Sequence, residues 1–470
     1  MNENFTHRIN YKLIHYISSN LSVYIFLGFI QLIIYSNIYL LQNLSTNISE
    51  YVRLFLLSFI VYFISIIISS KINVKRNDMK FFFISVFIFS GIYRALLVFV
   101  EPTLSEDIIR YYWDGKLLVN GVNPYLFRSS AHELDWLRNA TSGHHDFQNT
   151  FTVYPPIAQL FFSLIYLISG DNFLGMKITT ASIDFINGIL ITILFSKIYN
   201  RLSLTSSIIY CWSPLLITEF SISGHVDSLT IFFLLISFLF LHKHMFKSST
   251  VLYAVSCWTK FFPLFLFPLI ISYMKKEGQS VMKIFLWFSS ISVILLFPVF
   301  ISSGFNLITQ ILWYHTHIVY NPSIFFFVKN FIWNFQIGQK MILFMRILFL
   351  GTYLAIITKY FYAKKQIDFS DLMLNCLYVL GLYFIFAAAV FQWYLSWIIL
   401  FCALIGLNKK TLPWIIFSGA VVLAYLPQFS TKFDLVKITL IEYLPLYFLL
   451  WFAISYKFIS SLNIINKARR

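Results

Sequence analysis

The apolar stretch LSVYIFLGFIQLIIYSNIYLL, residues 21–41, indicates the class of fold that this chain adopts. About 20 apolar residues in helical conformation span the hydrocarbon core of a bilayer, so the stretch is long enough to cross it. It follows Arg8 and Lys12, exceeds the apolar core of a signal peptide in length and lacks a clean small-residue cleavage site. We therefore interpret it as a retained membrane anchor.

Similar apolar runs recur along the 470 residues, of which 59% are hydrophobic and 11% charged. The runs are continuously apolar rather than alternating, and backbone groups in lipid must pair internally, so helices are favoured over a β-barrel. The sequence thus predicts an all-α fold, a polytopic transmembrane helical bundle of about 13–14 spans in a single domain, residues 1–470. The expected spans are residues 21–42, 52–70, 81–100, 176–196, 204–222, 227–242, 281–300, 341–359, 371–390, 393–407, 412–427 and 439–457, with a broken hairpin at 250–274.

The distribution of charge predicts the topology. A net charge of +16 could suggest a nucleic-acid partner, but a membrane explains it better, because Lys and Arg collect in cytoplasmic loops. With the N-terminus inside, most of the 35 Lys and Arg residues fall on the cytoplasmic side. We therefore expect an integral, multi-pass protein of the cell membrane with both termini cytoplasmic, the lipid bilayer as a partner, and no nucleic acid.

Two apolar segments depart from this pattern of full spans. Residues 157–169 are too short to cross, so we expect a juxtamembrane or re-entrant helix there. In the hairpin at 250–274, two prolines indicate short helices that dip in and back, with Lys260 near their tip and able to snorkel to the inside. The longest loop, residues 101–156, then lies outside.

The outer loop begins with SEDIIRYYWDGKLLVNGVNPY, residues 105–125, which gathers charge in an otherwise apolar chain. Ser105 is a suitable N-cap, and Asn120-Gly121 is a suitable stop, so we expect a helix over 106–120.

One face of this helix would carry Asp107, Arg110, Tyr111 and Asp114, by their i, i+3, i+4, i+7 spacing. We expect the helix to lie on the membrane with its apolar and aromatic side down and this carboxylate–arginine face up. An ordinary solvated polar face with i, i+3 pairs is the alternative interpretation.

Two further clusters mark the outer side. TVYPPIAQLFF, residues 152–162, has a Pro pair that fixes an extended entry into the short helix. SGHVDSLTIFF, residues 223–233, places His225 and Asp227 at an outer membrane boundary. These two side chains could bind a metal or a phosphate-bearing head group, or they could simply open a helix as an N-cap and dipole pair.

At this point the residues resemble a known family. DIIRYYWDGKLLVNGVNPY resembles the D-x-x-R-Y-x-W-D-G … G-x-N-P-Y signature of polyprenyl-phosphate-mannose-dependent mannosyltransferases, which belong to the GT-C class of integral membrane glycosyltransferases. YPPIAQLFF, GHVDSL, KFFPLFLFPL and QWYLSW follow in the order expected for that family. The resemblance runs from about residue 94 to about residue 397, and residues 1–80 look like additional N-terminal spans.

The resemblance implies an enzyme that transfers a sugar, mannose by the family's pattern, from a polyprenyl-phosphate donor to an acceptor hydroxyl on the outer face, with inversion. Residues 101–175 would form the outer catalytic loop with its juxtamembrane helices. The acceptor, a glycan, lipid or protein, offers a weakly nucleophilic hydroxyl that needs a carboxylate base. By the family's pattern that base is Asp107, and Glu106 is its immediate rival.

The departing phosphate needs cationic or amide partners. Arg110 could provide one, or it could instead orient Asp107. Arg346 lies near the outer end of its span, whereas Arg94 and Asp184 could form a structural pair inside the membrane. The expected substrate-binding residues are Arg110, Tyr112, Trp113, Asp114, Asn123, Tyr125, Tyr154, His225, Asp227, Arg346, Gln392, Trp393 and Tyr394.

No organic cofactor is expected, and a divalent metal is possible if the loops bring Asp107, Asp114, His225 and Asp227 together. The four Cys lie in apolar runs without metal spacing. A transporter or flippase for lipid-linked sugars is an alternative, but it would favour inverted repeats that this sequence does not show. A polymerase or ligase of lipid-linked glycans is another, and it would use a lipid-diphosphate donor.

Overall fold

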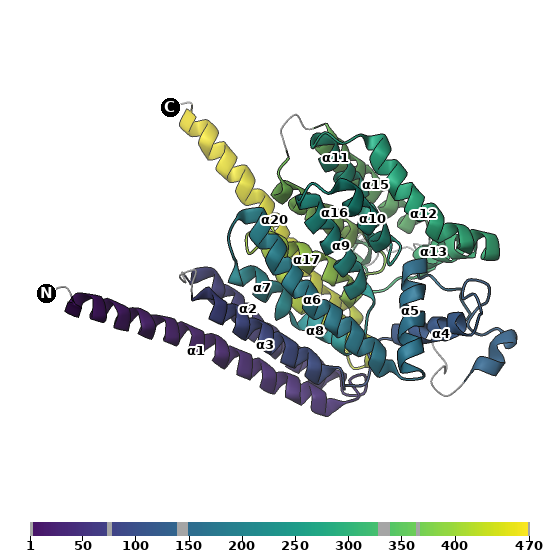
Figure 1. Cartoon of the computed structure of the whole chain (residues 1–470), viewed down its shortest axis with the longest axis horizontal. Coiled ribbons are helices and arrows are strands. Elements are labelled where there is room, and N and C mark those ends of the chain that lie inside the picture. The colour runs from purple at the N-terminus through teal and green to yellow at the C-terminus, as the bar shows by residue number, and fades with distance from the viewer. Residues whose placement is uncertain (1–2, 73–77, 139–148, 328–338, 363–366, 469–470) are drawn as a thin grey trace.

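The part of the chain that the structure describes is helical (Figure 1). The only other pairing within it is an isolated bridge between Tyr320 and Ala389. This computed structural model describes residues 3–72, 78–138, 149–327, 339–362 and 367–468, so residues 139–148 of the expected outer loop lie outside the described residues.

Within these ranges, nine helices are long and apolar enough to cross a membrane, which confirms an all-α, polytopic fold. Their outward faces carry exposed apolar side chains, such as Ile294, Phe297 and Ile301 on α12 (Val281–Ser303). Such faces are unfavourable in water and favourable against lipid tails. The protein is therefore a multi-pass membrane protein.

The first three helices pack side by side and against the rest of the bundle (Figure 1). Gln31, buried on the first, donates hydrogen bonds to Ser58 Oγ on the second (3.2 Å) and to the carbonyl of Trp212 (3.2 Å). Since buried polar groups must be paired, these bonds fix the N-terminal helices in one register against the bundle. The three helices are α1 (Glu3–Leu41), α2 (Ile48–Lys71) and α3 (Met79–Leu97).

The next helices form a small layer at the end of the bundle that lies opposite the two chain termini (Figure 1). The expected helix at 106–120 is confirmed as α4, and the segment at 157–169 is confirmed as a short helix, α5. Leu160, Leu164 and Ile168 are exposed along one side of α5, while its other side packs on α4. The elements are α4 (Asp107–Val119), η1 (His132–Leu137) and α5 (Pro156–Ser169).

The middle of the chain forms the centre of the bundle. The expected span at 204–222 is two helices of eight residues each, because Trp212 and Ser213 interrupt it and Pro214 begins the second helix. The hairpin at 250–274 is confirmed as two short helices around a 3₁₀ turn. The elements are α6 (Phe173–Tyr199), α7 (Leu204–Cys211), α8 (Pro214–Ser221), α9 (Asp227–His242), α10 (Phe246–Cys257), η3 (Phe262–Leu266) and α11 (Phe267–Lys276).

The C-terminal part continues the bundle, and its first helix, α12, contacts α5. The elements of this part are α12, α13 (Asn306–His317), α14 (Ile324–Phe327), α15 (Gln339–Phe361), α16 (Phe369–Phe386), η5 (Gln392–Tyr394), α17 (Leu395–Ile405), α18 (Leu412–Ala420), η6 (Val421–Ala424), α19 (Tyr425–Phe429) and α20 (Leu435–Ala468).

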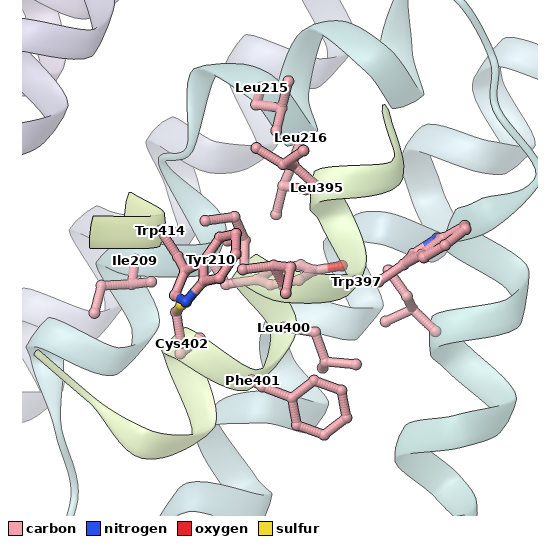
Figure 2. Close-up of a cluster of buried hydrophobic side chains, with 14 of the residues drawn as sticks. Ile209, Tyr210, Leu215, Leu216, Leu395, Trp397, Leu400, Phe401, Cys402 and Trp414 are labelled. Atoms are coloured by element: carbon pink, nitrogen blue, oxygen red, sulfur yellow. The ribbon is translucent and has the colours of Figure 1, made fainter. Parts of the chain in front are cut away.

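A continuous apolar core holds these helices together, and Figure 2 shows its centre. Leu395, Leu400 and Phe401 of α17 belong to this core, as do Leu215 and Leu216 of α8. Trp397, one α-helical turn from Leu400, belongs to the same core. Its indole N–H donates a hydrogen bond to the carboxylate of Asp227.

Arg94 and Asp184 form the expected pair between α3 and α6. Arg94 Nε lies 2.8 Å from Asp184 Oδ2, and both side chains are buried. Arg94 also donates to the carbonyl of Cys211 (3.0 Å), so it ties α7 to the pair. A charge in a membrane helix is costly unless it is paired. Because each charge here is paired with the other, we interpret the contact as structural.

Candidate active site

A cavity of about 580 Å³ opens beside the first turn of α4. Its wall comes from six parts of the chain that are distant in sequence: α4 with the segment before α5, the turn between α10 and η3 with η3 itself, α13, α16, η5 with α17, and α19. The residues that argue for chemistry among its lining are Glu106, Asp107, Arg110, Tyr154, Lys260, Tyr314, His315, Trp393, Tyr394 and Gln428.

Asp107 is the carboxylate in the first turn of α4, and its side chain is 16% exposed. Its Oδ2 accepts a hydrogen bond from the Tyr111 hydroxyl (3.3 Å) and lies 3.6 Å from His225 Nδ1. Burial alone would raise the pKa of Asp107, but the hydrogen bond and charge of His225, together with the charge of Lys260, lower it below its ordinary value. Asp107 is therefore ionised at neutral pH.

His225 lies behind Asp107, in the turn between α8 and α9, and is fully buried. Its Nε2 faces Glu219 Oε2 of α8 at 3.3 Å, and its ring stacks on Trp393 with centroids 3.9 Å apart. Burial would lower the pKa of His225, but the hydrogen bonds and charges of Asp107 and Glu219 raise it. The side chain lies between two carboxylates, which favour its protonated form.

Lys260 supplies a cation to the same cavity. Its Nζ lies 2.6 Å from Asp227 Oδ2, and the Trp397 indole donates to Asp227 Oδ1 (2.6 Å). The ammonium also lies 5.0 Å from the centre of the Tyr394 ring, and the side chain is 14% exposed. The nitrogen of Lys260 is thus held at the end of α9 that carries Asp227.

Arg110 and Asp114 lie one turn further along α4. Arg110 Nε lies 2.8 Å from Asp114 Oδ1, and the two side chains are 5% and 0% exposed. Asp114 Oδ2 accepts further hydrogen bonds from Thr152 and Gln159 (2.8 Å from Gln159 Nε2). The interpretation of an ordinary solvated face is wrong for Arg110 and Asp114, because Thr152 and Gln159 cover them. Arg110 pairs with Asp114 and not with Asp107.

Other expected substrate-binding residues lie outside the cavity. Tyr112 bonds to Asp171, and Trp113 packs in a small core with Leu134. The remaining contacts are Asn123 with Ser302, Tyr125 with the carbonyl of Tyr154, and Gln392 with the hydroxyl of Tyr320. These residues hold the α4–α5 layer and the η5 turn in place. They therefore support the residues that line the cavity but do not line it themselves.

Arg346 lies next to the cavity, on α15. It donates a hydrogen bond to the carbonyl of His315 and lines a smaller pocket of about 90 Å³. That pocket shares Tyr314, His315 and Tyr394 with the main cavity. Most of α15 is exposed on its other sides, so the smaller pocket lies between the cavity and a face directed at lipid.

Gly115 lets α4 and α5 approach closely. A Cβ at this position would come within 2.5 Å of the backbone carbonyl oxygen of Phe162. We therefore expect Gly115→Ala to push the helices apart and to lower stability by about 1–3 kcal/mol. Gly91→Ala is the matched control, because the Cβ there meets only a Phe185 ring atom at 3.6 Å. Thermal unfolding in detergent measures both; equal midpoints would contradict the expectation.

The carboxylates do not converge as a metal site would require. In the described residues no group of three or more His, Cys, Asp or Glu could hold a metal ion. Asp114 is bound by Arg110, and Asp227 by Lys260. The acidic donors that face the cavity are Asp107 and Glu106.

Five residues of this site were not among the expected site residues: Glu219, Lys260, Tyr314, His315 and Gln428. Glu219 reaches His225 from α8, within a run that reads as one apolar span. Lys260 was noticed only as a charge inside an apolar hairpin. That signal could have found it, since a charge at such a position is usually functional, but its partner Asp227 is 33 residues away.

The family comparison covers several of the helices that carry this site. Residues 83–276 match the model of the MptA_B family, described as alpha-(1->6)-mannopyranosyltransferase, N-terminal domain. The matched segment includes Asp107, Glu219, His225, Asp227 and Lys260. The protein is a membrane glycosyltransferase. The sequence resemblance is thereby confirmed for the enzyme, and no curated protein matches the chain.

Proposed function

We propose that the enzyme transfers mannose from a polyprenyl-phosphate donor to a sugar hydroxyl, forming an α-(1→6) linkage. The observation that carries this proposal is one cavity with an ionised carboxylate, Asp107, and an ammonium group, Lys260, on its wall. The first suits a general base and the second suits a phosphate leaving group. The linkage and the sugar follow the description of the matched family.

In the proposed step, Asp107 takes the proton of the acceptor hydroxyl while the oxygen of that hydroxyl attacks the anomeric carbon of the donor sugar. The new carbon–oxygen bond forms as the bond to the phosphate oxygen breaks, and the lipid phosphate leaves with the electron pair. A single displacement inverts the anomeric centre, so an α-linked product requires a β-linked donor. Lys260 stabilises the negative charge that grows on the phosphate.

A lipid donor is supported by the apolar part of the cavity wall. The turn after Lys260 lines the cavity with Phe261, Phe262 and Phe265. The pocket at Arg346 continues from the cavity toward a lipid-facing helix. A polyprenyl chain could leave along this route while its phosphate stays beside Lys260.

The proposed orientation places this cavity on the outer face of the cell membrane, with both termini in the cytoplasm. The loop charges favour it. The two ends of the chain also lie away from α4 in the bundle (Figure 1). We further propose that residues 1–470 act as one domain, with residues 1–80 as additional spans and residues 101–175 as the catalytic loop.

The test uses purified enzyme in lipid nanodiscs, radiolabelled polyprenyl-phosphate-β-mannose and an alkyl α-mannoside acceptor. We expect labelled disaccharide that an α-(1→6)-mannosidase cleaves. A polyprenyl-diphosphate sugar serves as the second donor, because its use in place of the monophosphate would favour a polymerase or ligase. Absence of transfer from either donor to this or to membrane acceptors would defeat the proposal.

Chelation is a further test of the same reaction. Because Asp114 and Asp227 are already held by cationic side chains, we expect EDTA to leave the initial rate unchanged. If EDTA abolished the rate and a divalent cation restored it, the charge on the leaving phosphate would be stabilised by a metal, with Asp107 and Glu106 as its closest acidic donors.

A further inference from the structure

A row of three buried ionisable groups runs from the cavity into the protein. It consists of Asp107 on α4, His225 in the α8–α9 turn and Glu219 on α8, and we call it the buried triad. Only Asp107 borders the cavity. Trp393 lies between His225 and the cavity, with its ring stacked on the imidazole. His225 is therefore poorly placed to touch a substrate.

The contacts of the buried triad indicate where the protons of His225 lie. His225 Nε2 and Glu219 Oε2 are buried and face each other at 3.3 Å as an ion-pair contact, and neither atom makes a hydrogen bond in the described part of the chain. Buried polar atoms are paired, so Nε2 carries a proton directed at Glu219. Glu219 is itself fixed, because the Tyr425 hydroxyl donates to its Oε1 (2.9 Å).

The other ring nitrogen faces the cavity side. His225 Nδ1 lies 3.6 Å from Asp107 Oδ2 and 3.5 Å from the Tyr111 hydroxyl, which itself lies 3.3 Å from the same Asp107 oxygen. Two carboxylates flank one imidazole, so the doubly protonated ring is favoured.

We propose that His225, held by Glu219, is the positioning residue that keeps Asp107 ionised and aimed into the cavity. This inference rests on the proposed function, in which Asp107 is the base. Burial in an apolar protein favours the neutral carboxylic acid, which cannot accept a proton from the acceptor. The imidazolium reverses this preference without entering the cavity, and Glu219 offsets the cost of burying the imidazolium.

The charged and titratable groups around His225 define what a pH profile reports. Asp107 and Tyr111 face it from α4, and Glu219 faces it from α8. Tyr425, which also lines the cavity, donates a hydrogen bond to Glu219, and Lys260, which is paired with Asp227, acts on Asp107 through its charge. Of these groups, Asp107 must lose its proton and His225 must keep its own for the reaction. The fall of kcat/KM at low pH, the acid limb, then reports the pKa of Asp107. The fall at high pH, the alkaline limb, reports the pKa of His225.

Two neutral replacements test the triad. His225→Gln removes the positive charge, so the pKa of Asp107 rises and the acid limb moves to higher pH by about one unit or more. Glu219→Gln removes one of the two carboxylates that stabilise the imidazolium, so the alkaline limb moves to lower pH. In both variants kcat falls while the KM for polyprenyl-phosphate-mannose changes little, since neither side chain borders the cavity.

The control is Glu442→Gln, which replaces a buried carboxylate on α20 that binds Asn321 outside the cavity wall. Its pH limbs should match those of the wild type. Thermal unfolding and gel filtration in detergent establish that each variant is folded. If His225→Gln does not fold, Glu219→Gln decides alone, because it keeps the size and the acceptor oxygen of the side chain.

Unmoved limbs in folded variants would overturn the role of the triad. They would leave the proposed function standing as long as the wild type transfers mannose and Asp107→Asn does not. Conversely, full activity of Asp107→Asn would defeat the base assignment itself, and with it the reason for the triad.

Discussion

Asp107→Asn should lower kcat by about 10²–10⁴-fold, the usual contribution of a general base. Asparagine keeps the size of the side chain and can still accept the Tyr111 hydrogen bond, but it cannot take the acceptor's proton. The KM for the lipid donor should change little, because Lys260 and the apolar wall are untouched. Initial rates with polyprenyl-phosphate-mannose at saturating acceptor measure the effect.

Glu106→Gln is the matched control, since Glu106 is adjacent in sequence and lines the same cavity. We expect a much smaller loss of rate for this variant, because the contacts to Tyr111 and His225 are made by Asp107. The reverse pattern, with Glu106→Gln inactive and Asp107→Asn active, would make Glu106 the base.

Lys260→Met should produce the second large effect, on stability and on donor binding together. It leaves Asp227, whose side chain is fully buried, without its cation, and removing one partner of a buried pair costs about 3–5 kcal/mol. The methionine keeps the apolar stem over the Tyr394 ring. Loss of a charge-assisted contact to phosphate, about 1.5–3 kcal/mol, should raise the donor KM by about 10–100-fold.

The double variant Lys260→Met with Asp227→Asn separates the two effects. Asparagine carries no charge and can still accept from the Trp397 indole, so the midpoint of thermal unfolding should recover toward that of the wild type. The donor KM should stay high, because the ammonium is still missing. Recovery of both quantities would show that Lys260 acts only as the structural partner of Asp227.

Much of the α4 helix could be predicted from sequence, because its signals are local. Its stop at Asn120 and the i, i+3, i+4, i+7 spacing of Asp107, Arg110 and Asp114 on one face were predicted, as found, but its N-cap is Glu106 rather than the expected Ser105. The environment of that face could not be predicted. The Thr152–Gln159 segment covers Asp114, and this contact joins residues up to 45 positions apart. Periodicity describes which side chains share a face, and says nothing of what packs on it.

The sequence by itself determined the membrane class, the all-α fold and the position of the carboxylate-bearing helix, because hydropathy and helix caps act over one or two turns. Only the tertiary structure decided the partners: His225 for Asp107, Glu219 for His225, and Lys260 for Asp227. These pairs join separate helices, and burial makes each charge depend on its neighbour. A local sequence pattern therefore cannot predict which buried charges pair when helices that are distant in sequence pack together.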